Sequence, residues 1–595
     1  MKFLLIVCSI LLAITGCDMK KNKPGEEKTE SNKELATLLE KYYEERLQLF
    51  PLEATAIGDT RYNDLLRIDF TDNYRAKLND FYTRYLAEIN KYKSDELNEK
   101  DKLSYDVFSY ELGMSKEGLA FRDNYIPFNQ FYALPLTMGQ LGSGAGNQPF
   151  KTVKDYDDWV KRATEFSVWA DSAIAYFKKG IDAQFVLPGA IVKKMIPQMD
   201  AMSTADVQKS IFYAPVSNIP ATFSDADKKR LTEEYTRLIK QQLEPAYKKL
   251  NDFLKKTYLP AARASSGIDA LPGGSSYYAY LVKQQTTTDK TPEEIYSTGL
   301  QEVARIKSLM DSVKNSTGFK GDLSAFFEYM KTDKKFMPYK TPKDVLDGFE
   351  KIHQTMLPQV KKMFNRTPKT PFEIRQTEAF RAASASAEYF QGSPDGTRPG
   401  IFYVPIIDAT TFNTTSGMES LFLHEAIPGH HYQISLQQED TTLPKFRRYG
   451  SNNAYVEGWA LYCESLGKEL GLYTDPYQYM GALGDEMHRA IRLVVDVAIH
   501  AKGMSREDAI KYMMENEAIS LQGATAEIER YMVIPGQALG YKIGALKIKE
   551  LREKYEKQLG TKFNLAVFHD EILKDGSLPL SVLEKKMDVW ANNYK

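Results

Sequence analysis

Cysteine is scarce in this chain, with 3 among 595 residues. Cys8 and Cys17 lie near the N-terminus, so Cys463 would be the single thiol of a processed protein, and a disulfide within it is excluded. Small exported domains usually depend on disulfides, but a chain of this length buries a core large enough to fold without them. No G-x-S-x-G motif occurs and nothing around Cys463 indicates a nucleophile, so we expect a small core residue there.

The chain also has no excess of charge of either sign and no long apolar run. Lysine and arginine number 78 against 79 for aspartate and glutamate, so no net field would attract nucleic acid, and we expect no nucleic-acid partner. The apolar run at residues 3–13 is about a dozen residues long, which is too short to span a bilayer. The chain should therefore fold as a compact globular protein.

The first residues predict export. Met1 and Lys2 precede the apolar run, and small residues then lead to Cys17 in the sequence ITGC, which resembles the bacterial lipobox. We expect a signal peptide over 1–16, a lipid on Cys17 and a polar, flexible tether over 17–33. The protein would be an exported bacterial lipoprotein, held at the cell envelope by its lipid alone and facing the periplasm or the exterior. An uncleaved anchor helix with an incidental cysteine is the alternative.

Most of the remaining chain has the pattern of long amphipathic helices, with apolar residues three and four positions apart. The clearest segments are 35–50, 74–92, 156–179 and 225–259. A Pro-, Gly- and Ser-rich stretch, LPAARASSGIDALPGGSS, interrupts the pattern before helices resume near Thr291. We predict a mainly α-helical protein of two lobes, an N-terminal helical lobe over 34–288 and a catalytic lobe over 289–595.

Short aromatic or β-branched segments between residues 372 and 413 predict a small β-sheet. FEIRQT, EYFQ and GIFYVP are separated by turn-rich sequence that includes SPDGTRPG. This sheet would lie beside the histidine motif that follows it in the chain. An exposed edge strand there could bind an extended peptide by strand addition, although a purely structural hairpin fits the sequence equally well.

Histidines cluster in one part of the chain. Five of the 7 histidines lie between residues 424 and 500, and three of these five occur in LFLHEAIPGHHYQ. Histidine is a common zinc ligand, and the carboxylate of Glu425, next to His424, is suited to take a proton from a metal-activated water. The motif therefore predicts a hydrolytic zinc site.

The spacing of the histidines requires a bend. His424 and His430 are six residues apart, about 600° of rotation, so an unbroken helix would point them to different sides. Pro428 lacks a backbone donor and Gly429 tolerates unusual dihedral angles, so a kink there would bring His430 back toward His424. We prefer His430 as the second ligand. His431 shares the face of His424 but lies about two turns away, and it is the alternative.

The segment AYVEGWALYCESL supplies an acidic residue downstream. A glutamate in a helix is usually exposed, but Glu457 is flanked by Val456, Trp459 and Leu461, which indicates an inward face. After a histidine-glutamate motif, Glu457 is the predicted third metal ligand. Glu464, two turns further along the same face, would be a hydrogen-bond partner for a ligand imidazole.

Several motifs together resemble one protein family. HEAIPGHH, EGWALY and PGQALGYKIG look like the lipoprotein-associated DUF885 family, a group related to helical gluzincin peptidases, and passages such as LPGGSSYYAYLVKQQ extend the resemblance over roughly residues 35–590. Helical gluzincins such as the thimet oligopeptidase group carry H-E-F-G-H. When the Gly-His of that motif is aligned with Gly429 and His430, Ile427 and Pro428 remain as an insertion. This alignment favours His430 over His431 as the metal ligand.

The resemblance implies a bilobal helical metallopeptidase with one zinc ion per chain and the small sheet beside its active site. Its implied zinc ligands are His424, His430 and Glu457, and its implied general base is Glu425. The loop GQALGYKIG matches a family loop whose tyrosines stabilise an oxyanion, and Tyr541 falls at one of them, with a packed core tyrosine as the alternative. The position of a second family tyrosine is occupied by Gly544 in this chain, so the resemblance implies no second oxyanion-stabilising tyrosine here.

A polar stripe runs along an otherwise apolar helical segment. It consists of Arg489, Arg492, Asp496 and His500. These residues would form a buried ion-pair network, or Arg489 and His500 would reach the carbonyl or terminal carboxylate of a substrate. Arg530 and Gln537, close to the Tyr541 loop, are further candidates for substrate binding.

We therefore expect a zinc-dependent hydrolase that cleaves peptide bonds with the help of Glu425. A non-catalytic lipoprotein that binds peptides on the same fold is one alternative, and an amidase acting on a non-peptide amide is another. The presence of Glu425 argues against binding alone, because a binding protein needs ligands but not a base. Manganese or cobalt would fit the same ligand types.

Overall fold

The computed structural model describes residues 30–378, 386–393, 396 and 398–594. The predicted signal peptide, the predicted lipid attachment at Cys17 and most of the predicted tether lie outside the described residues. Within the described part the protein is mainly helical with one three-stranded sheet, which confirms the predicted mainly α-helical fold with a small sheet, while the bilobal metallopeptidase architecture stays a prediction. None of the helices in this part combines the length and the hydrophobicity that a membrane span requires.

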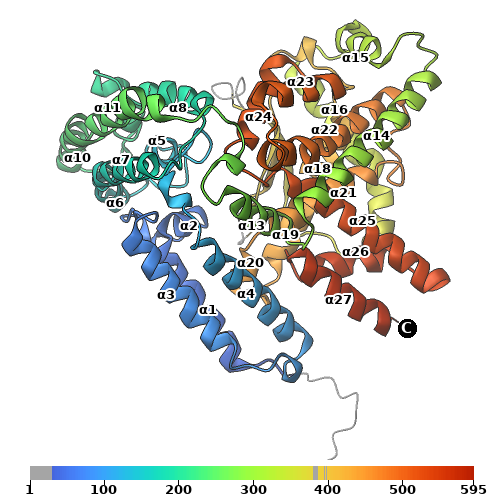
Figure 1. Cartoon of the computed structure of the whole chain (residues 1–595), viewed down its shortest axis with the longest axis horizontal. Helices are drawn as coiled ribbons and strands as arrows, with labels where there is room; N and C mark the ends of the chain where they lie inside the picture. Colours follow the sequence, from blue (N-terminus) through green and yellow to red (C-terminus); the bar gives the residue numbers. More distant parts are fainter. Residues whose placement is uncertain (1–29, 379–385, 394–395, 397, 595) are drawn as a thin grey trace, which may run out of the picture.

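The N-terminal half contains two groups of helices, and the second of them lies on the left in Figure 1. The first group is α1 (Lys33–Leu49), α2 (Pro51–Ala56), α3 (Asp72–Ile89) and α4 (Glu99–Gly118). The second is α5 (Leu134–Gly142), α6 (Val153–Thr164), α7 (Phe166–Asp182), α8 (Gly189–Ala201), α9 (Ala214–Ser217), α10 (Asp225–Leu238), α11 (Glu244–Phe253) and α12 (Leu259–Ala261). The segment 156–179 is not one helix as predicted, because the backbone at Glu165, with ψ −16°, separates α6 from α7. The segment 225–259 is one helical run, in which π-helical turns join α10, α11 and α12.

Helix α13 (Gly274–Thr286) leads into the C-terminal half, which begins with α14 (Pro292–Ser316). Thr291 caps α14 in a capping box with Glu294, and Pro292 occupies its first turn, so the helix starts where the sequence predicts. The following helices are α15 (Leu323–Thr332), α16 (Pro342–Met363), α18 (Met418–Glu425), α19 (His430–Glu439), α20 (Lys445–Arg448), α21 (Asn453–Ser465), α22 (Pro476–Ala501), α23 (Arg506–Asn516), α24 (Leu521–Tyr531), α25 (Leu539–Leu559), α26 (Leu565–Leu573) and α27 (Leu580–Asn593).

The predicted sheet is present and precedes α18. Its strands are β1 (Phe372–Gln376), β2 (Glu388–Phe390) and β3 (Gly400–Val404). They lie in the order β1-β3-β2, with β1 parallel and β2 antiparallel to the central strand. The central strand is the most buried, and Phe402 on it packs edge-on against Phe349 of α16, 5.2 Å between ring centroids.

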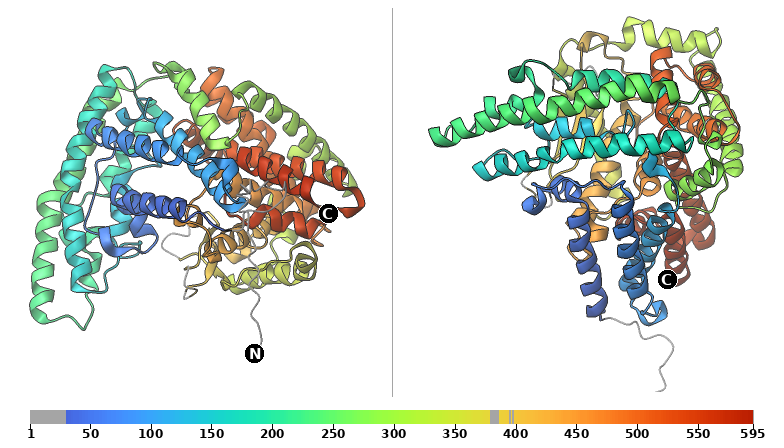
Figure 2. Two further views of the ribbon diagram at one scale, coloured as in Figure 1. Left: turned by 90° about the horizontal axis from the view of Figure 1, so that it is seen from below. Right: turned by 60° about the vertical axis from the view of Figure 1, so that its left-hand side comes forward.

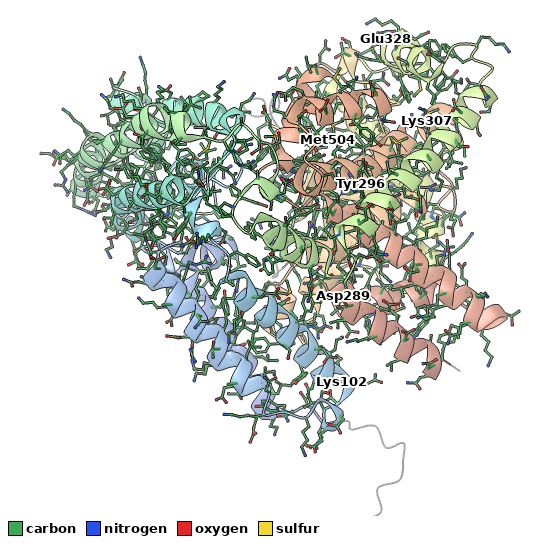
Figure 3. The ribbon with its side chains drawn as sticks, viewed as in Figure 1. Lys102, Asp289, Tyr296, Lys307, Glu328 and Met504 are labelled. Carbon is green, nitrogen blue, oxygen red and sulfur yellow. The ribbon has the colours of Figure 1, made fainter. Side chains whose placement is uncertain are left out.

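Two clusters of buried apolar residues form the core. One joins α1, α3 and α4 to the sheet, α18, α21 and α25–α27, and the other joins α5–α12 to α14, α22 and α24. Figure 2 shows α5–α11 again as a group beside the C-terminal helices. Asp289, at the predicted lobe boundary, is labelled in Figure 3 and lies to the right of this group. Both clusters draw residues from either side of that boundary, so the division at residue 288 stays a prediction.

The N-terminal helices support the short helix α20, which leads into α21. Lys445 of α20 forms an ion pair with Glu40 of α1 at 2.5 Å. Phe446 packs against Phe108 of α4, with 5.2 Å between ring centroids, and Arg447 donates to the hydroxyl of Ser104 at 3.0 Å. Residues between about 340 and 405 positions apart in the sequence thus hold the start of the helix that carries the predicted acidic ligand.

Candidate metal centre

The chain bends between His424 and His430. Helix α18 ends at Glu425 and α19 begins at His430, so each histidine lies at the end of its own short helix. The backbone leaves the helical region at Ala426, with φ −106° and ψ −103°, and at Gly429, with φ −75° and ψ −128°. The bend expected from the sequence is therefore present.

Gly429 and Trp459 fix the shape of this bend. A Cβ on Gly429 would lie 2.0 Å from the carbonyl oxygen of His424, so only glycine allows the chain to return so closely. The indole N–H of Trp459, which is fully buried in α21, donates to the carbonyl oxygen of Pro428 at 2.9 Å. This hydrogen bond ties the bend to the helix that carries Glu457.

Glu457 faces both histidines. Its Oε2 atom lies 3.6 Å from Nε2 of His424 and 3.6 Å from Nε2 of His430. The two imidazole rings are nearly perpendicular, at 89° with 4.7 Å between centroids, and the three ligand atoms all lie within 4.8 Å of one another. In a tetrahedral zinc site with bonds of about 2.0–2.1 Å, neighbouring ligand atoms are roughly 3.3 Å apart. This donor set therefore fits a zinc ion that His424, His430 and Glu457 would hold.

Glu464 determines the orientation of His424. Its Oε1 atom lies 2.7 Å from Nδ1 of His424, and both side chains are buried. When Nδ1 donates its proton to this carboxylate, the lone pair of Nε2 is free to point toward Glu457. Burial alone would lower the pKa of His424, but hydrogen bonds to Glu457 and Glu464 outweigh it and raise this pKa well above its ordinary value. Burial would likewise raise the pKa of Glu457, yet its contacts with the two histidines hold it well below the ordinary value.

His431 lies away from this group and faces the sheet. Its Nδ1 atom is 3.1 Å from the hydroxyl of Tyr389 on β2, and its ring is 4.9 Å from that of Phe372 on β1. Burial, with a smaller contribution from His353, lowers the pKa of His431 to about 4. The structure brings His430, and not His431, to His424 and Glu457.

Glu425 follows His424 directly in the chain and is half-buried. It has no hydrogen bond or ion pair with any described residue, whereas the carboxylates of Glu457 and Glu464 are both engaged by histidines. A carboxylate that stands beside a metal ligand without a partner of its own is available as a base.

Tyr541 is placed by a close crossing of two helices. Gly458 of α21 and Gly544 of α25 leave no space between them, since a Cβ on Gly458 would lie 2.5 Å from the Cα of Gly544. The neighbour of Gly458, Glu457, is thereby set beside α25, and Tyr541 lies one turn before Gly544. No side chain fits at Gly544, because a Cβ there would lie 1.9 Å from the carbonyl oxygen of Ala454.

The polar stripe of α22 divides into residues with different roles. His500 is fully buried, with Nδ1 accepting from the N–H of Ile268 at 3.2 Å and Nε2 donating to the carbonyl of Tyr531 at 2.9 Å, so it cannot reach a substrate. Burial lowers its pKa to about 3. Asp496 is also buried, and its Oδ1 accepts from the N–H of Gly536 at 3.0 Å. Both residues are held by hydrogen bonds and neither forms an ion pair with a described residue, so these two do not form the buried ion-pair network expected from the sequence.

Arg492 and Arg489, on the same stripe, contact the ring of Tyr541. The guanidinium of Arg492 lies 4.8 Å, and that of Arg489 5.5 Å, from the centre of the Tyr541 ring. Arg492 also forms an ion pair with Glu527 at 3.0 Å, which is one element of the ion-pair network expected from the sequence.

Arg530 and Gln537 form a link to α21 and do not belong to the histidine group. Arg530 donates to Oε1 of Gln537 at 2.9 Å, and Asn453, the first residue of α21, donates to the carbonyl of Gln537 at 3.0 Å. Because Glu457 is one turn after Asn453, this chain of hydrogen bonds positions the start of its helix.

One further contact, which no sequence pattern indicates, ties α18 to α22. The hydroxyl of Ser420, one turn before His424, donates to Oδ2 of Asp485 at 2.5 Å. Burial, together with the charge of Glu464, raises the pKa of Asp485 to about 7. No motif could have revealed this pair, because its partners are 65 residues apart.

Comparisons with known proteins agree with the helical fold. The chain is similar to the crystal structure of a candidate lipoprotein from Colwellia psychrerythraea, with 28% identity and a TM-score of 0.85 over 94% of this chain and 99% of that one. It is also similar in fold to a candidate lipoprotein of unknown function from Shewanella oneidensis, with 19% identity and a TM-score of 0.75 over 93% of this chain and 99% of that one. No curated protein sequence matches the chain.

The pattern of one protein family matches residues 51–587, which is most of the chain and includes the histidine group. The chain therefore belongs to DUF885, a family of bacterial proteins of unknown function.

Proposed function

We propose that this protein is a zinc-dependent hydrolase that cleaves peptide bonds, related to the helical gluzincin peptidases. The observation that carries the proposal is the convergence of Nε2 of His424, Nε2 of His430 and Oε2 of Glu457, with both histidine nitrogens 3.6 Å from the carboxylate oxygen. Glu425 stands beside this group with no partner among the described residues. Ligands and an unengaged carboxylate together are what hydrolysis requires.

Bound zinc would supply Lewis-acid polarisation of a water molecule and of the scissile carbonyl. The carboxylate of Glu425 takes a proton from the attacking water and returns it to the nitrogen of the leaving amine. Glu464 keeps the Nδ1 proton on His424, so that Nε2 stays available as a ligand. The hydroxyl of Tyr541 donates a hydrogen bond to the oxyanion that forms on the former carbonyl oxygen.

We place the protein at the cell envelope as an exported lipoprotein. The proposal rests on the lipobox-like sequence before Cys17 and on the similarity to the Colwellia protein, which is itself described as a candidate lipoprotein. Labelling of the full chain with a radioactive fatty acid in a bacterial host tests it. Label that is absent from the wild type, or unchanged in Cys17→Ser, would exclude lipidation.

The test of function compares wild type with Glu425→Gln and His430→Ala. Metal content is measured by elemental analysis, and cleavage of a mixed peptide library is followed by mass spectrometry. We expect about one zinc per chain in the wild type and in Glu425→Gln, cleavage by the wild type alone, and loss of both zinc and cleavage in His430→Ala. An exposed glutamate of α16, changed in Glu350→Gln, controls for the substitution itself.

Each alternative predicts a different result. If wild type and Glu425→Gln both bind peptides and neither cleaves them, the protein is a binding lipoprotein. If the wild type cleaves only non-peptide amides and depends on Glu425, it is an amidase. Equal cleavage by wild type and Glu425→Gln would exclude Glu425 as the base.

A further inference from the structure

Two arginines of α22 flank the ring of Tyr541. The guanidinium carbons of Arg489 and Arg492 lie 5.5 and 4.8 Å from the ring centre, and the two residues are three positions apart on one face of the helix. A guanidinium beside an aromatic ring keeps its edge free to donate hydrogen bonds. The arrangement therefore presents two cationic groups beside the tyrosine that is expected to contact the substrate.

Both arginines have donors that no partner uses. Arg489 forms no ion pair or hydrogen bond with any described residue, and its Nε atom is shielded from solvent. The Arg492 side chain is only 5% exposed; its Nε donates to Tyr531 and its Nη2 to Glu527, but its Nη1 is buried without a partner. A buried donor left unpaired costs roughly 1–3 kcal/mol, and more when the group is charged, so these donors favour an acceptor from outside the chain.

Neighbouring acids do not neutralise Arg489. Glu527 is shared between Arg492 at 3.0 Å and His488 at 3.5 Å, and Glu517 pairs with His488 at 2.9 Å. Asp485, one turn before Arg489, accepts a hydrogen bond from Ser420 and forms no ion pair with Arg489. Arg489 therefore has no ion-pair partner among the described residues, and its nearest acids are engaged by other side chains.

From the packing of α18 on α22 we infer that Arg489 lies on the same level as His424. Gly481 of α22 packs against Thr415 and Gly417, and Asp485, one turn later, contacts Ser420. The contacts thus advance in the same direction along both helices. One further turn brings α22 to Arg489 and α18 to His424.

We propose that Arg489 and Arg492 bind a carboxylate of the substrate, so that the enzyme acts on peptides that present an anionic group close to the scissile bond. The inference rests on the proposed hydrolase and names its substrate class. Arginine is suited to this role because its planar guanidinium offers parallel N–H donors to the two oxygens of a carboxylate. The carboxylate is either the C-terminus of the peptide or an acidic side chain.

Four forms of a dansylated tripeptide library distinguish these two sources. The peptides carry a free or an amidated C-terminus, combined with Glu or Gln as the central residue. We expect wild type to cleave one carboxylate-bearing form with kcat/KM about 10- to 100-fold above its neutral counterpart, as a charged hydrogen bond predicts. Preference for the free acid identifies the C-terminus, and preference for Glu identifies the side chain.

Arg489→Met should remove this preference mainly through KM, while Arg489→Lys should keep part of it. Arg237→Met removes the same atoms from an exposed site on α10 and serves as the matched control. Arg492 is not changed, because its removal would take the ion-pair partner away from the carboxylate of Glu527.

Binding of the same peptides to Glu425→Gln, measured by fluorescence anisotropy, separates this inference from the proposed function. If no peptide is cleaved but binding still requires a carboxylate and Arg489, the hydrolase proposal fails and the carboxylate site stands. If all four forms are bound and cleaved alike, or if Arg489→Met keeps the wild-type preference, the carboxylate site is wrong.

Discussion

Oε1 of Glu464 lies 2.7 Å from Nδ1 of His424, on the side of the imidazole opposite to Glu457. The ring is thus held between two carboxylates, one for each nitrogen. Nδ1 of His424 therefore holds the ring in its orientation, while Nε2 can bind a metal, because the proton on Nδ1 leaves Nε2 with a lone pair.

Glu464→Gln should weaken metal binding without removing a ligand. The amide can turn its NH₂ toward Nδ1 and favour the wrong tautomer, so we expect zinc affinity to fall by about 10- to 100-fold. Competition with a fluorescent chelator measures the affinity, and circular dichroism checks that the helices are retained. Glu469→Gln, at an exposed glutamate of the following turn, is the control, and an unchanged affinity in Glu464→Gln would show that the contact does not orient the ligand.

The bend between the histidines could be predicted because its cause is local. Pro428 and Gly429 lie inside the motif, and no other part of the chain is needed to see that a regular helix fails there. The position of Glu457 was accessible from its apolar neighbours and from the family resemblance. The hydrogen bond from Trp459 that holds the bend was not, because it joins residues 31 positions apart.

His500 and Arg489 show where periodicity stops being informative. Both belong to the same stripe of α22 and both were candidates for substrate binding. The nitrogens of His500 are taken by backbone groups of Ile268 and Tyr531, which the sequence places far away, whereas no described residue takes the donors of Arg489. A periodic pattern along one helix indicates the face of the helix on which a residue lies. It does not indicate which segment of the chain packs against that face.

His569 should make stability depend on pH. Its Nδ1 donates to the carbonyl of Met363 and its Nε2 accepts from Tyr462, both at 2.9 Å, and burial lowers its pKa to about 3. Between the folded pKa near 3 and the unfolded pKa near 6.5, the unfolded chain binds the proton and the folded chain does not. The contribution of His569 is therefore present above about pH 6.5 and is lost as the pH falls, by about 2 kcal/mol at pH 5.

Thermal denaturation at pH 7 and pH 5 measures this contribution. His569→Gln should be less stable than wild type at pH 7, because it loses the fixed hydrogen bonds, but its thermal midpoint should fall less between the two pH values. His353→Gln, at a half-buried histidine of α16, is the matched control for the substitution itself. A pH dependence in His569→Gln equal to that of the wild type would show that this histidine is not buried in its neutral form.

Gly544→Ala should damage the metal site from the opposite helix. The new methyl group would lie 1.9 Å from the carbonyl oxygen of Ala454 and 2.8 Å from the Cα of Gly458, so α21 and α25 must move apart. Overpacking of this kind costs typically about 1–3 kcal/mol, and the shift of α21 would move Glu457 away from the histidines. We expect a lower thermal midpoint together with weaker zinc binding.

Gly113→Ala is the matched control for this substitution. It places the same methyl group on α4, where no atom lies within 4 Å, and it should leave zinc binding unchanged while keeping or raising stability, since alanine is favoured over glycine in helices by up to about 1 kcal/mol. If Gly544→Ala destabilises the fold but binds zinc like wild type, the crossing supports the helices and does not position Glu457. If it changes neither property, α21 and α25 have more freedom than their packing indicates, and the crossing does not position Glu457.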